Sequence, residues 1–443
     1  IAGGAALASI RRHNFVTLVC LVVLSFGVGW WRGAAMMVQL AGYQTYKLQK
    51  VTIIGQATDD AVYGERSQLT FGLGNLRVVQ PAATALPGTI KVAGFGANAI
   101  YRGDTVRVTG RLYPTRGNNQ ASISFAKLAV LQTGNSSIDN LRRRFAAGLQ
   151  SALPEPQASL GLGLLIGQRS TLPPDVSVTL LTVGLTHIIA VSGYNLTIIV
   201  DSVRRLAGKR SKYQTMAACV VLIALFLLIT GSSPSIVRAS IISLLGLTAW
   251  YYGRTIKPLV LLLTAGAISV CINPMYLWGN VSWYLSFLAF FGVLVVAPLV
   301  TERLYGKRKP KLIGQIVIES SCAQIMTVPY VLFIFGHISL VALLANVLVV
   351  ALIPIAMLLC VVAGLAGAIM PAIAGWFAWP AKWLLTYMVD VAGLLARIPH
   401  AALQDLYISF GYMLVCYGLC ASVVYIVWRR YGAAVPLDRM SGL

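Results

Sequence analysis

The stretch Val183–Val200, VGLTHIIAVSGYNLTIIV, is an apolar segment of membrane-spanning length with hydrophilic groups near its middle. The polar residues there are His187, Ser192, Tyr194 and Asn195, and Gly193 lies among them. Lipid tails offer no hydrogen-bond partners, so polar side chains at this depth must face protein or water. The stretch therefore predicts a helical membrane bundle whose interior presents other polar groups to it.

The composition of the whole chain indicates the same class of protein. The chain is 57% hydrophobic, and apolar runs of about 20 residues, the length of a transmembrane helix, recur throughout it. Its 35 Lys and Arg exceed its 13 Asp and Glu, and many of the basic residues lie in short loops beside apolar runs, where they indicate the cytoplasmic side. The seven cysteines lie inside apolar runs, so no metal-binding or disulfide spacing is visible.

Changes in composition divide the chain into five segments. We expect a membrane anchor in 1–38, an extracytoplasmic domain in 39–135, amphipathic and interfacial helices in 136–177, a transmembrane bundle in 178–430 and a cytoplasmic tail in 431–443. Arg11 and Arg12 precede the apolar run Phe15–Trp31, and no convincing signal-peptide cleavage site follows it. The basic flank places the N-terminus in the cytoplasm and the next domain outside.

The outer domain is polar, rich in turns and alternating in hydrophobicity, a pattern typical of short strands. The expected strands are Val51–Ala57, Ser67–Leu73, Leu76–Gln80, Thr89–Val92, Thr105–Tyr113 and Ala121–Leu131. Five or six short strands in a domain of this size favour a small barrel of the OB type. The expected fold class is thus a polytopic α-helical membrane protein with an N-terminal extracytoplasmic OB-like β-barrel domain.

One expected strand carries basic and aromatic residues on a single face. Val106, Val108, Gly110 and Leu112 alternate there with Arg107, Thr109, Arg111 and Tyr113. Residues 39–150 hold 13 Lys and Arg against 5 Asp and Glu, and basic grooves lined with aromatic rings bind single-stranded nucleic acid without reading its sequence. Arg107, Arg111 and Tyr113 are therefore predicted to bind DNA. The alternative is a positively charged domain that rests against anionic lipid headgroups.

The following segments are expected to return the chain to the membrane. Ser137–Leu153 has apolar residues at helical spacing opposite Arg142, Arg143 and Arg144, which predicts an amphipathic helix at the membrane surface. Ala158–Gly167 is too short to span a bilayer, so it is expected to be re-entrant or interfacial.

Apolar runs and basic loops together predict ten spans with both termini in the cytoplasm. The expected spans are Phe15–Trp31, Val178–Val200, Met216–Thr230, Ile236–Trp250, Leu259–Ile272, Ser282–Val300, Leu312–Gly336, two within Ile338–Trp379, and Leu406–Trp428. Lys382–Ile398 mixes apolar and charged residues, so we expect it to lie along the outer surface.

Several motifs accompany the segment Gly184–Leu196 in a fixed order along the chain. They are Gly167-Gln168-Arg169, Arg238 within Pro234–Ala239, Asn273-Pro274, Tyr284–Gly292, Gln324, Pro329, Phe335–Ser339 and Asn346. With the anchor and the OB-like domain, this order resembles the ComEC family of inner-membrane competence proteins for DNA uptake, over nearly the whole chain. The resemblance implies passage of single-stranded DNA across the cytoplasmic membrane.

The chain also departs from the family pattern. The family usually has His where this chain has Asn195, an acidic residue at Gln168 and Gln at Tyr284, so two titratable groups are replaced by groups that only hydrogen-bond. Many members carry a C-terminal metallo-β-lactamase-like domain, proposed as a nuclease. The chain ends soon after Arg430 and its four histidines form no metal motif, so a nuclease is expected in a separate protein or in a missing part of this one.

The candidate DNA path consists of Arg169, His187, Ser192, Asn195, Arg238, Gln324 and Asn346. His187 and Asn195 are eight residues apart, which places them roughly on one face of an unbroken helix. An arginine that faced the bundle interior would bind a phosphate backbone. The alternatives are interhelical hydrogen bonds and arginines that reach lipid headgroups. Glu319 is either a functional carboxylate or, as we slightly favour, an ion-pair partner of the basic loop at Lys311.

These features predict a passive DNA channel rather than an enzyme, without a cofactor or a metal. The sequence has no Gly-x-x-x-x-Gly-Lys-Ser/Thr nucleotide-binding loop and no Gly-x-Ser-x-Gly nucleophile motif. A cytoplasmic helicase or translocase is therefore expected to drive transport, with an external DNA receptor and membrane lipids as further partners. The alternatives are a small-solute or ion transporter with a polar midplane site and a non-conducting membrane scaffold.

Overall fold

The computed structural model describes residues 15–431 apart from 64–67, 98, 115–118, 135, 169–171, 190–195, 197–199, 201–202, 205–210, 232–233, 255–256 and 307–309. The described residues divide into two compact units. The first holds those of Ile1–Ala147, Gln168–Thr171 and Ala267–Asn280, and the second holds those of Gly148–Gly167, Leu172–Gly266 and Val281–Leu443. Each unit has its own buried apolar clusters.

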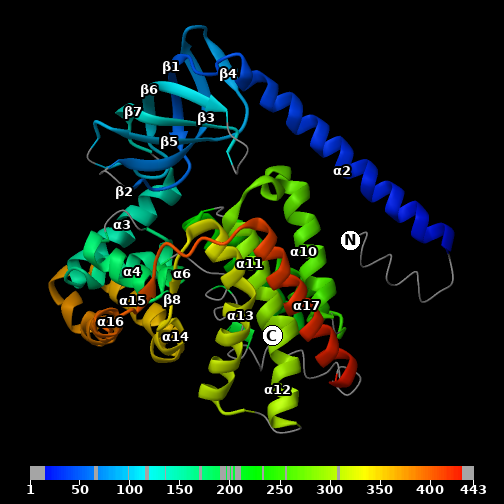
Figure 1. The fold of residues 1–443 in the computed structure, drawn as a ribbon. Helices are drawn as coiled ribbons and strands as arrows, with labels where there is room; N and C mark the ends of the chain where they lie inside the picture. Colours follow the sequence, from blue (N-terminus) through cyan, green and yellow to red (C-terminus); the bar gives the residue numbers. More distant parts are fainter. Residues whose placement is uncertain are drawn as a thin grey trace. The chain divides into compact units, whose positions relative to one another are not determined.

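Seven strands form the β-sheet of the first unit (Figure 1). They are β1 (Lys50–Ala57), β2 (Val62–Tyr63), β3 (Leu69–Gln80), β4 (Thr84–Leu86), β5 (Ile90–Phe95), β6 (Thr105–Pro114) and β7 (Ala121–Gln132). All expected strands are present, but Ser67–Leu73 and Leu76–Gln80 join into β3 because Asn75 continues the strand with a left-handed φ of 51°. Asparagine tolerates this conformation better than most residues do.

The strand pairings of this sheet form a cycle that begins and ends at β1. β1 pairs with β6, β6 with β7, β7 with β5, β5 with β3, and β3 with β1. The β5–β7 pair is parallel and the other four pairs are antiparallel. The inward side chains of these strands form a single apolar core that includes Val51, Ile53, Leu73, Val106 and Val108.

Helix α2 (Phe15–Gln44) covers the expected anchor Phe15–Trp31 and continues to the first strands. Tyr43, near its end, is fully buried in the core of the sheet, and its hydroxyl donates a 2.5 Å hydrogen bond to the carbonyl of Pro87. Burial in this apolar core raises the pKa of the Tyr43 hydroxyl above its ordinary value. The end of α2 is therefore part of the folded sheet unit.

The amphipathic helix is present as α3 (Ser137–Ala152), but its arginines do not all serve a membrane surface. Arg142 binds Asp60 through two hydrogen bonds, and Arg143 binds Asp104 at 2.7 Å. Because these acids lie far from α3 in sequence, the helical pattern alone could not reveal the pairs. Arg142 and Arg143 are thus bound to acidic residues of the sheet unit, whereas Arg144 is exposed.

The second unit is helical. Its main helices are α4 (Gln157–Ile166), α5 (Pro174–Thr182), α6 (Thr186–Ile189), α8 (Lys212–Thr230), α9 (Pro234–Tyr251), α10 (Pro258–Ile272, whose end belongs to the first unit), α11 (Val281–Phe291), α12 (Ala297–Tyr305), α13 (Leu312–Phe335), α14 (Ala342–Val349), α15 (Ile353–Ile369), α16 (Ala374–Ala396) and α17 (Phe410–Tyr431). Within the described part of the chain, five helical segments are long and apolar enough to cross a membrane. They are Lys212–Thr230, Val281–Tyr305, Ile313–Phe335, Ala342–Ile369 and Phe410–Val427. The protein is thus mostly helical with an N-terminal β-sheet unit.

The expected span Val178–Val200 is not one continuous helix. Helix α5 ends at Thr182 and a turn at Val183-Gly184 precedes the short α6. Gly184 has a left-handed φ of 74°, and a Cβ there would lie 2.8 Å from the side chain of Ala342. The chain therefore turns where only glycine fits both the backbone conformation and the close approach to α14.

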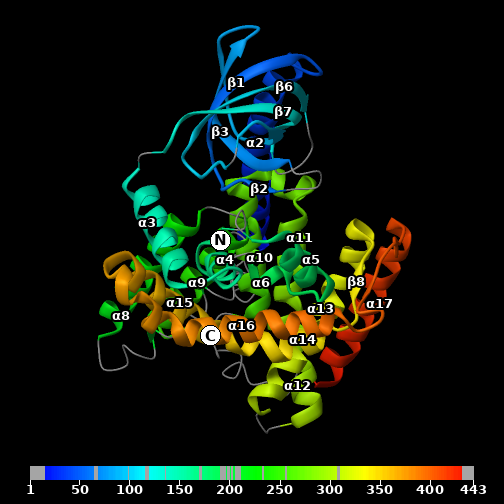
Figure 2. The same ribbon diagram turned by 90° about the vertical axis from the view of Figure 1, so that its left-hand side faces the viewer.

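Helices α15 and α16 run side by side (Figure 2). Helix α16 begins at Ala374, earlier than the expected surface segment Lys382–Ile398, and buries Leu385 and Met388 on its inner side. The backbones of α15 and the end of α3 are in direct contact, because a Cβ on Gly367 would collide with the carbonyl of Gly148. Small residues thus permit a helix contact closer than side chains would allow.

Candidate nucleic-acid interface

The alternation expected on β6 is confirmed. Val106, Val108 and Leu112 are fully buried, whereas Arg107 and Arg111 are exposed and Tyr113 retains 40% of its accessible surface. The three residues predicted to bind DNA therefore point away from the core of the sheet. Their outward position follows from the two-residue period of a strand.

Lysines on the neighbouring strands extend this surface. Lys50 on β1 lies opposite Arg111, and Lys127 on β7 lies opposite Thr109. Side chains that are directly opposite in an antiparallel pair lie on the same face of the sheet. The hydroxyl oxygens of Thr52 and Thr109, which are also opposite each other, are 3.3 Å apart.

The same registers continue the surface to the remaining strands of the cycle. Lys127 is paired with Phe95 on β5. Tyr113 and Lys91 are both paired with Ser122, on either side of β7. Arg107 and Arg77 are both paired with Ile54, on either side of β1. We call the exposed set the outer basic surface. It comprises Lys50, Arg77, Lys91, Phe95, Arg107, Arg111, Tyr113, Phe125 and Lys127.

Phe125 joins this surface through an irregularity of β7. Because Thr109 pairs with Lys127 and Arg111 with Ser124, both Phe125 and Ala126 lie opposite Gly110 in a β-bulge. Phe125 has a left-handed φ of 54° and is 64% exposed, whereas Ala126 is buried. Simple alternation after Ala121 and Ile123 would have turned the ring inward, so sequence reasoning missed it.

The charge of the outer basic surface is not offset by the two best-buried acids of the sheet unit. Asp60 and Asp104 are the partners of Arg142 and Arg143 on α3. The side chains of Asp60 and Asp104 are only 6% and 3% exposed, so neither is accessible to a ligand. The six cations of the outer basic surface therefore create a positive field beside exposed aromatic rings.

Two predicted path residues of the second unit lie in different surroundings. His187 on α6 is exposed, and its Nδ1 is 3.1 Å from the carbonyl of Gly184. Arg238 on α9 is fully buried, with its guanidinium 5.0 Å from the ring centre of Phe287 and 3.5 Å from the carbonyl of Trp283. Arg238 is therefore packed against α11 rather than directed to lipid.

Gln324 and Asn346 lie on α13 and α14, which contact each other. The Oδ1 of Asn346 is buried and has no hydrogen-bond partner among the described residues. Glu319 accepts a 2.8 Å hydrogen bond from Gln315 on its own helix, and it forms no ion pair with any described residue, Lys311 included. Arg169, Ser192 and Asn195 lie outside the described residues.

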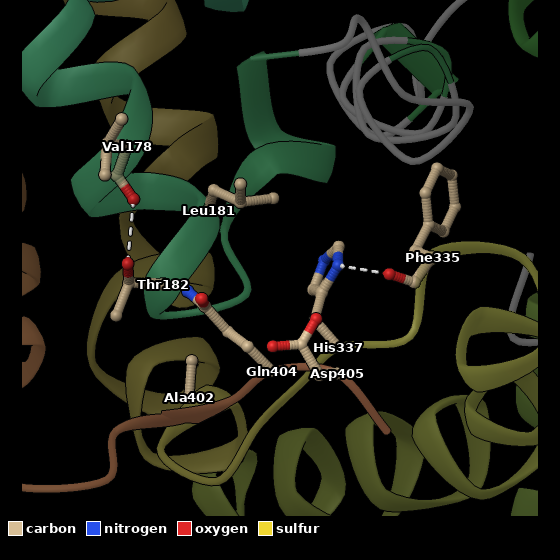
Figure 3. Close-up of a pocket in the computed structure, with 8 residues that line it drawn as sticks. All are labelled: Val178, Leu181, Thr182, Phe335, His337, Ala402, Gln404 and Asp405. Atoms are coloured by element: carbon tan, nitrogen blue, oxygen red, sulfur yellow. Dashed lines mark hydrogen bonds between the residues drawn. The ribbon is translucent and has the colours of Figure 1, made fainter. Parts of the chain in front are cut away.

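A cavity of about 220 Å³ lies elsewhere in the second unit (Figure 3). It is lined by Val178, Leu181, Thr182, Phe335, His337, Ala402, Gln404 and Asp405. Of the predicted path residues that the structure describes, none lines it. Its polar groups come from three segments that are distant in sequence, which is why no local motif indicated the cavity.

The fold and these surfaces define a helical membrane protein with a basic, aromatic β-sheet unit. A family model described as competence protein matches residues 164–430. The chain therefore belongs to the competence protein family, which confirms the resemblance found in its motifs.

A curated relative supports the same assignment. ComE operon protein 3 of Bacillus subtilis (strain 168) is 24% identical over 318 residues, which cover 65% of this chain and 40% of the relative. The chain thus spans about two fifths of the length of that relative. No solved structure matches the chain.

Proposed function

We propose that the protein takes part in DNA uptake as a channel for single-stranded DNA across the cytoplasmic membrane, and that the β-sheet unit guides the strand to the helical bundle. Membership of the competence protein family supports a role in DNA uptake. The outer basic surface is the observation that most favours a single strand as the cargo. Exposed bases stack on aromatic rings while cations bind the phosphates.

The proposal includes a barrel of the OB type outside the membrane. The pairing of β1 with both β6 and β3, and the single parallel pair β5–β7, support this closure. Small barrels of this type bind oligonucleotides on their strand faces. The outer basic surface crosses the strands of this cycle, so a flexible single strand can follow it.

The membrane part of the proposal concerns the helical bundle. It crosses the cytoplasmic membrane with both termini inside, which agrees with basic residues such as Arg303 and Lys311 beside candidate spans. The candidate path comprises the residues named from the sequence, with Asn346 supported by its buried, unpartnered oxygen. Amide and basic groups along it would replace phosphate hydration.

The channel is proposed to be passive and to have no enzymatic activity of its own. A cytoplasmic helicase or translocase supplies the work, an external receptor delivers DNA, and any strand degradation is performed by a separate protein or by a part of this protein outside the given sequence. Membrane lipids surround the bundle. None of these partners is needed for the first test, which measures binding alone.

The binding test uses the full chain in lipid nanodiscs and a labelled single-stranded oligonucleotide at several salt concentrations. Replacing Arg107 and Arg111 together by Ala should weaken binding and reduce the slope of log affinity against log salt by about 1.4, since each phosphate contact to a single strand contributes about 0.7. Arg144→Ala is the matched control, because Arg144 is exposed on α3 outside the outer basic surface. Equal slopes in all three proteins would remove the proposed role of this surface.

The cellular test measures the entry of labelled DNA into the cytoplasm of cells that lack the protein. We expect the cytoplasmic signal to be lost and to return with the native chain. An unchanged signal would rule out the channel function, whatever the isolated protein binds.

A further inference from the structure

Two of the three chain segments that line the cavity of Figure 3, 335–337 and 402–405, are tied together by backbone hydrogen bonds. Strand β8 (Ile338–Ser339) pairs with β9 (Ala402–Leu403), and the amide of Leu406 donates a 2.7 Å hydrogen bond to the carbonyl of Gly336. Gly336 has a left-handed φ of 65°, and a Cβ there would lie 2.6 Å from the ring of Tyr407. These contacts hold the chain segments of His337 and Asp405 together.

Asp405 has a left-handed backbone conformation, with a φ of 61°. Aspartate and asparagine enter this region more readily than other non-glycine residues do. The neighbouring hydrogen bond of Leu406 fixes this conformation and places the Asp405 carboxylate at the cavity.

The polar groups of the cavity mostly accept hydrogen bonds. Thr182 donates its hydroxyl hydrogen to the carbonyl of Val178, and His337 Nδ1 lies 3.4 Å from the carbonyl of Phe335, so in the neutral ring Nε2 is an acceptor. Asp405 adds two acceptor oxygens, and Gln404 adds one oxygen and the amide donors. None of the eight lining residues that the structure describes is Lys or Arg. These lining groups therefore suit a ligand that donates N–H groups better than a phosphate.

Aliphatic side chains and rings line different sides of the cavity. Figure 3 shows Val178 and Leu181 of α5 on one side, the rings of His337 and Phe335 on the other, and Gln404 and Asp405 between them. The ring centres of Phe335 and His337 are 5.7 Å apart. A flat ring with donor groups along one edge matches this arrangement better than a compact, strongly hydrated ammonium group does.

The cavity lies at one end of two candidate membrane spans. Helix α13 follows Lys311 and ends at Phe335, and α17 runs from Phe410 toward Arg429. The basic residues mark the other ends of these helices as cytoplasmic, so the cavity end faces outward. A strand that enters from outside would meet this end of the bundle first.

We propose that this cavity binds a nucleobase of the incoming single strand through the amino edge of the base, with the Asp405 carboxylate as the principal acceptor. This inference rests on the proposed function as a DNA channel and adds a base preference to it. Cytosine binds better than thymine, because its amino group donates a hydrogen bond that a carboxylate accepts. Thymine has a carbonyl oxygen at the same position. Unstacked bases are recognised in this manner in single strands.

The test uses free nucleosides, because their binding requires neither transport nor a phosphate backbone. Deoxycytidine and thymidine are titrated against the full chain in phosphatidylglycerol nanodiscs, with saturation-transfer NMR as the readout. Native protein should bind deoxycytidine about fivefold more tightly than thymidine, the difference that one favourable hydrogen bond gives. Asp405→Asn should reduce this preference, because an amide oxygen is a weaker acceptor than a carboxylate and the amide N–H can donate to the carbonyl oxygen of thymine. Asparagine also accepts the left-handed backbone.

Asp390→Asn on α16 is the matched control and should keep the preference, because Asp390 is exposed and does not line the cavity. Equal affinity of the two nucleosides for native protein would overturn the inference. So would a preference that disappears when phosphatidylethanolamine replaces phosphatidylglycerol, because an amine headgroup would then be the occupant. The two proposals can fail separately. If replacing Arg107 and Arg111 by Ala removes the salt-dependent DNA binding of the native chain, but the two nucleosides bind equally, the channel proposal stands and this inference alone fails.

Discussion

Arg142 and Asp60 form a two-armed ion pair, with Nη1 to Oδ1 at 3.1 Å and Nη2 to Oδ2 at 2.5 Å. Their side chains are only 10% and 6% exposed. The pair joins α3 to the loop after β1, and a second pair joins Arg143 to Asp104 before β6. Helix α3 is thus fixed to the sheet unit at two points by charges that are largely removed from water.

We expect Arg142→Ala to destabilise the sheet unit by about 3 kcal/mol, because it leaves the Asp60 carboxylate buried without its cation. Amide hydrogen exchange of β1 and β6 in the full chain measures the effect. Arg144→Ala should change stability by less than about 0.5 kcal/mol, since Arg144 is exposed on the same helix. Equal exchange rates in the two variants would show that the ion pair contributes little.

Phe125→Gly separates the role of the ring from that of the backbone. Glycine adopts the φ of 54° without strain, so we expect unchanged or slightly higher stability of the sheet unit, by up to about 1 kcal/mol. Loss of the stacking surface should lower single-stranded DNA affinity about tenfold. Phe125→Tyr keeps a ring and should keep the affinity. Full affinity in Phe125→Gly would exclude the ring from the binding surface.

The sequence was sufficient where a local pattern sets the structure. The alternation in Thr105–Tyr113 predicted which face of β6 is buried. Helical spacing predicted α3, and the apolar run after the basic loop predicted α13, nearly to their ends. It was insufficient where distant residues compete with the local pattern. The bulge at Phe125 lies beside the close approach of Gly94 to Ala126, and the break at Gly184 lies against Ala342. No repeat or motif in the sequence contains these contacts.

The same distinction applies to the candidate sites. Arg107, Arg111 and Tyr113 were predicted because they share one strand, whereas Lys50 and Lys127 join them only through strand pairing. The cavity at Asp405 combines segments from α5, the end of α13 and the chain after β9. Tertiary assembly, and not local propensity, brings such groups together.

Replacements at Arg238 test whether its charge or its packing matters. Arg238→Met fills much of the same volume beside Phe287 without a charge, so we expect membrane abundance near that of the native protein and strongly reduced DNA uptake. Arg238→Lys should retain part of the uptake, because it keeps a cation but loses the planar guanidinium. Immunoblots of membranes and labelled-DNA uptake provide the two readouts. Normal uptake with Arg238→Met would assign a purely packing role to this residue.

The contact between α3 and α15 predicts a steric effect. Gly148→Ala or Gly367→Ala places a methyl group against the facing backbone, and we expect a loss of about 2 kcal/mol of stability from overpacking. Gly393→Ala on α16 is the control, since no atom lies within 4 Å of its Cβ position. It should stabilise the helix by about 0.5 kcal/mol. Thermal unfolding of the full chain in detergent compares the three variants.

Tyr43→Phe tests the junction between α2 and the sheet. The variant removes the hydrogen bond to the carbonyl of Pro87 and leaves that acceptor without its partner, so we expect a loss of about 1 kcal/mol at pH 7. The raised pKa of Tyr43 also predicts how this difference depends on pH. Above about pH 10 the unfolded tyrosine ionises while the buried one stays protonated, so the native protein loses stability as pH rises further.

Phenylalanine has no proton to lose, and the stability advantage of the native protein over Tyr43→Phe should therefore shrink as pH increases from 9 to 11. The expected change is up to about 1.4 kcal/mol per pH unit once the pH exceeds the unfolded pKa. Urea-induced unfolding of the strands, followed by circular dichroism at each pH, measures it in the full chain. Because every other tyrosine and lysine titrates in both proteins, their difference isolates Tyr43. A difference that stays constant across this range would mean that the Tyr43 hydroxyl is not buried in the folded protein.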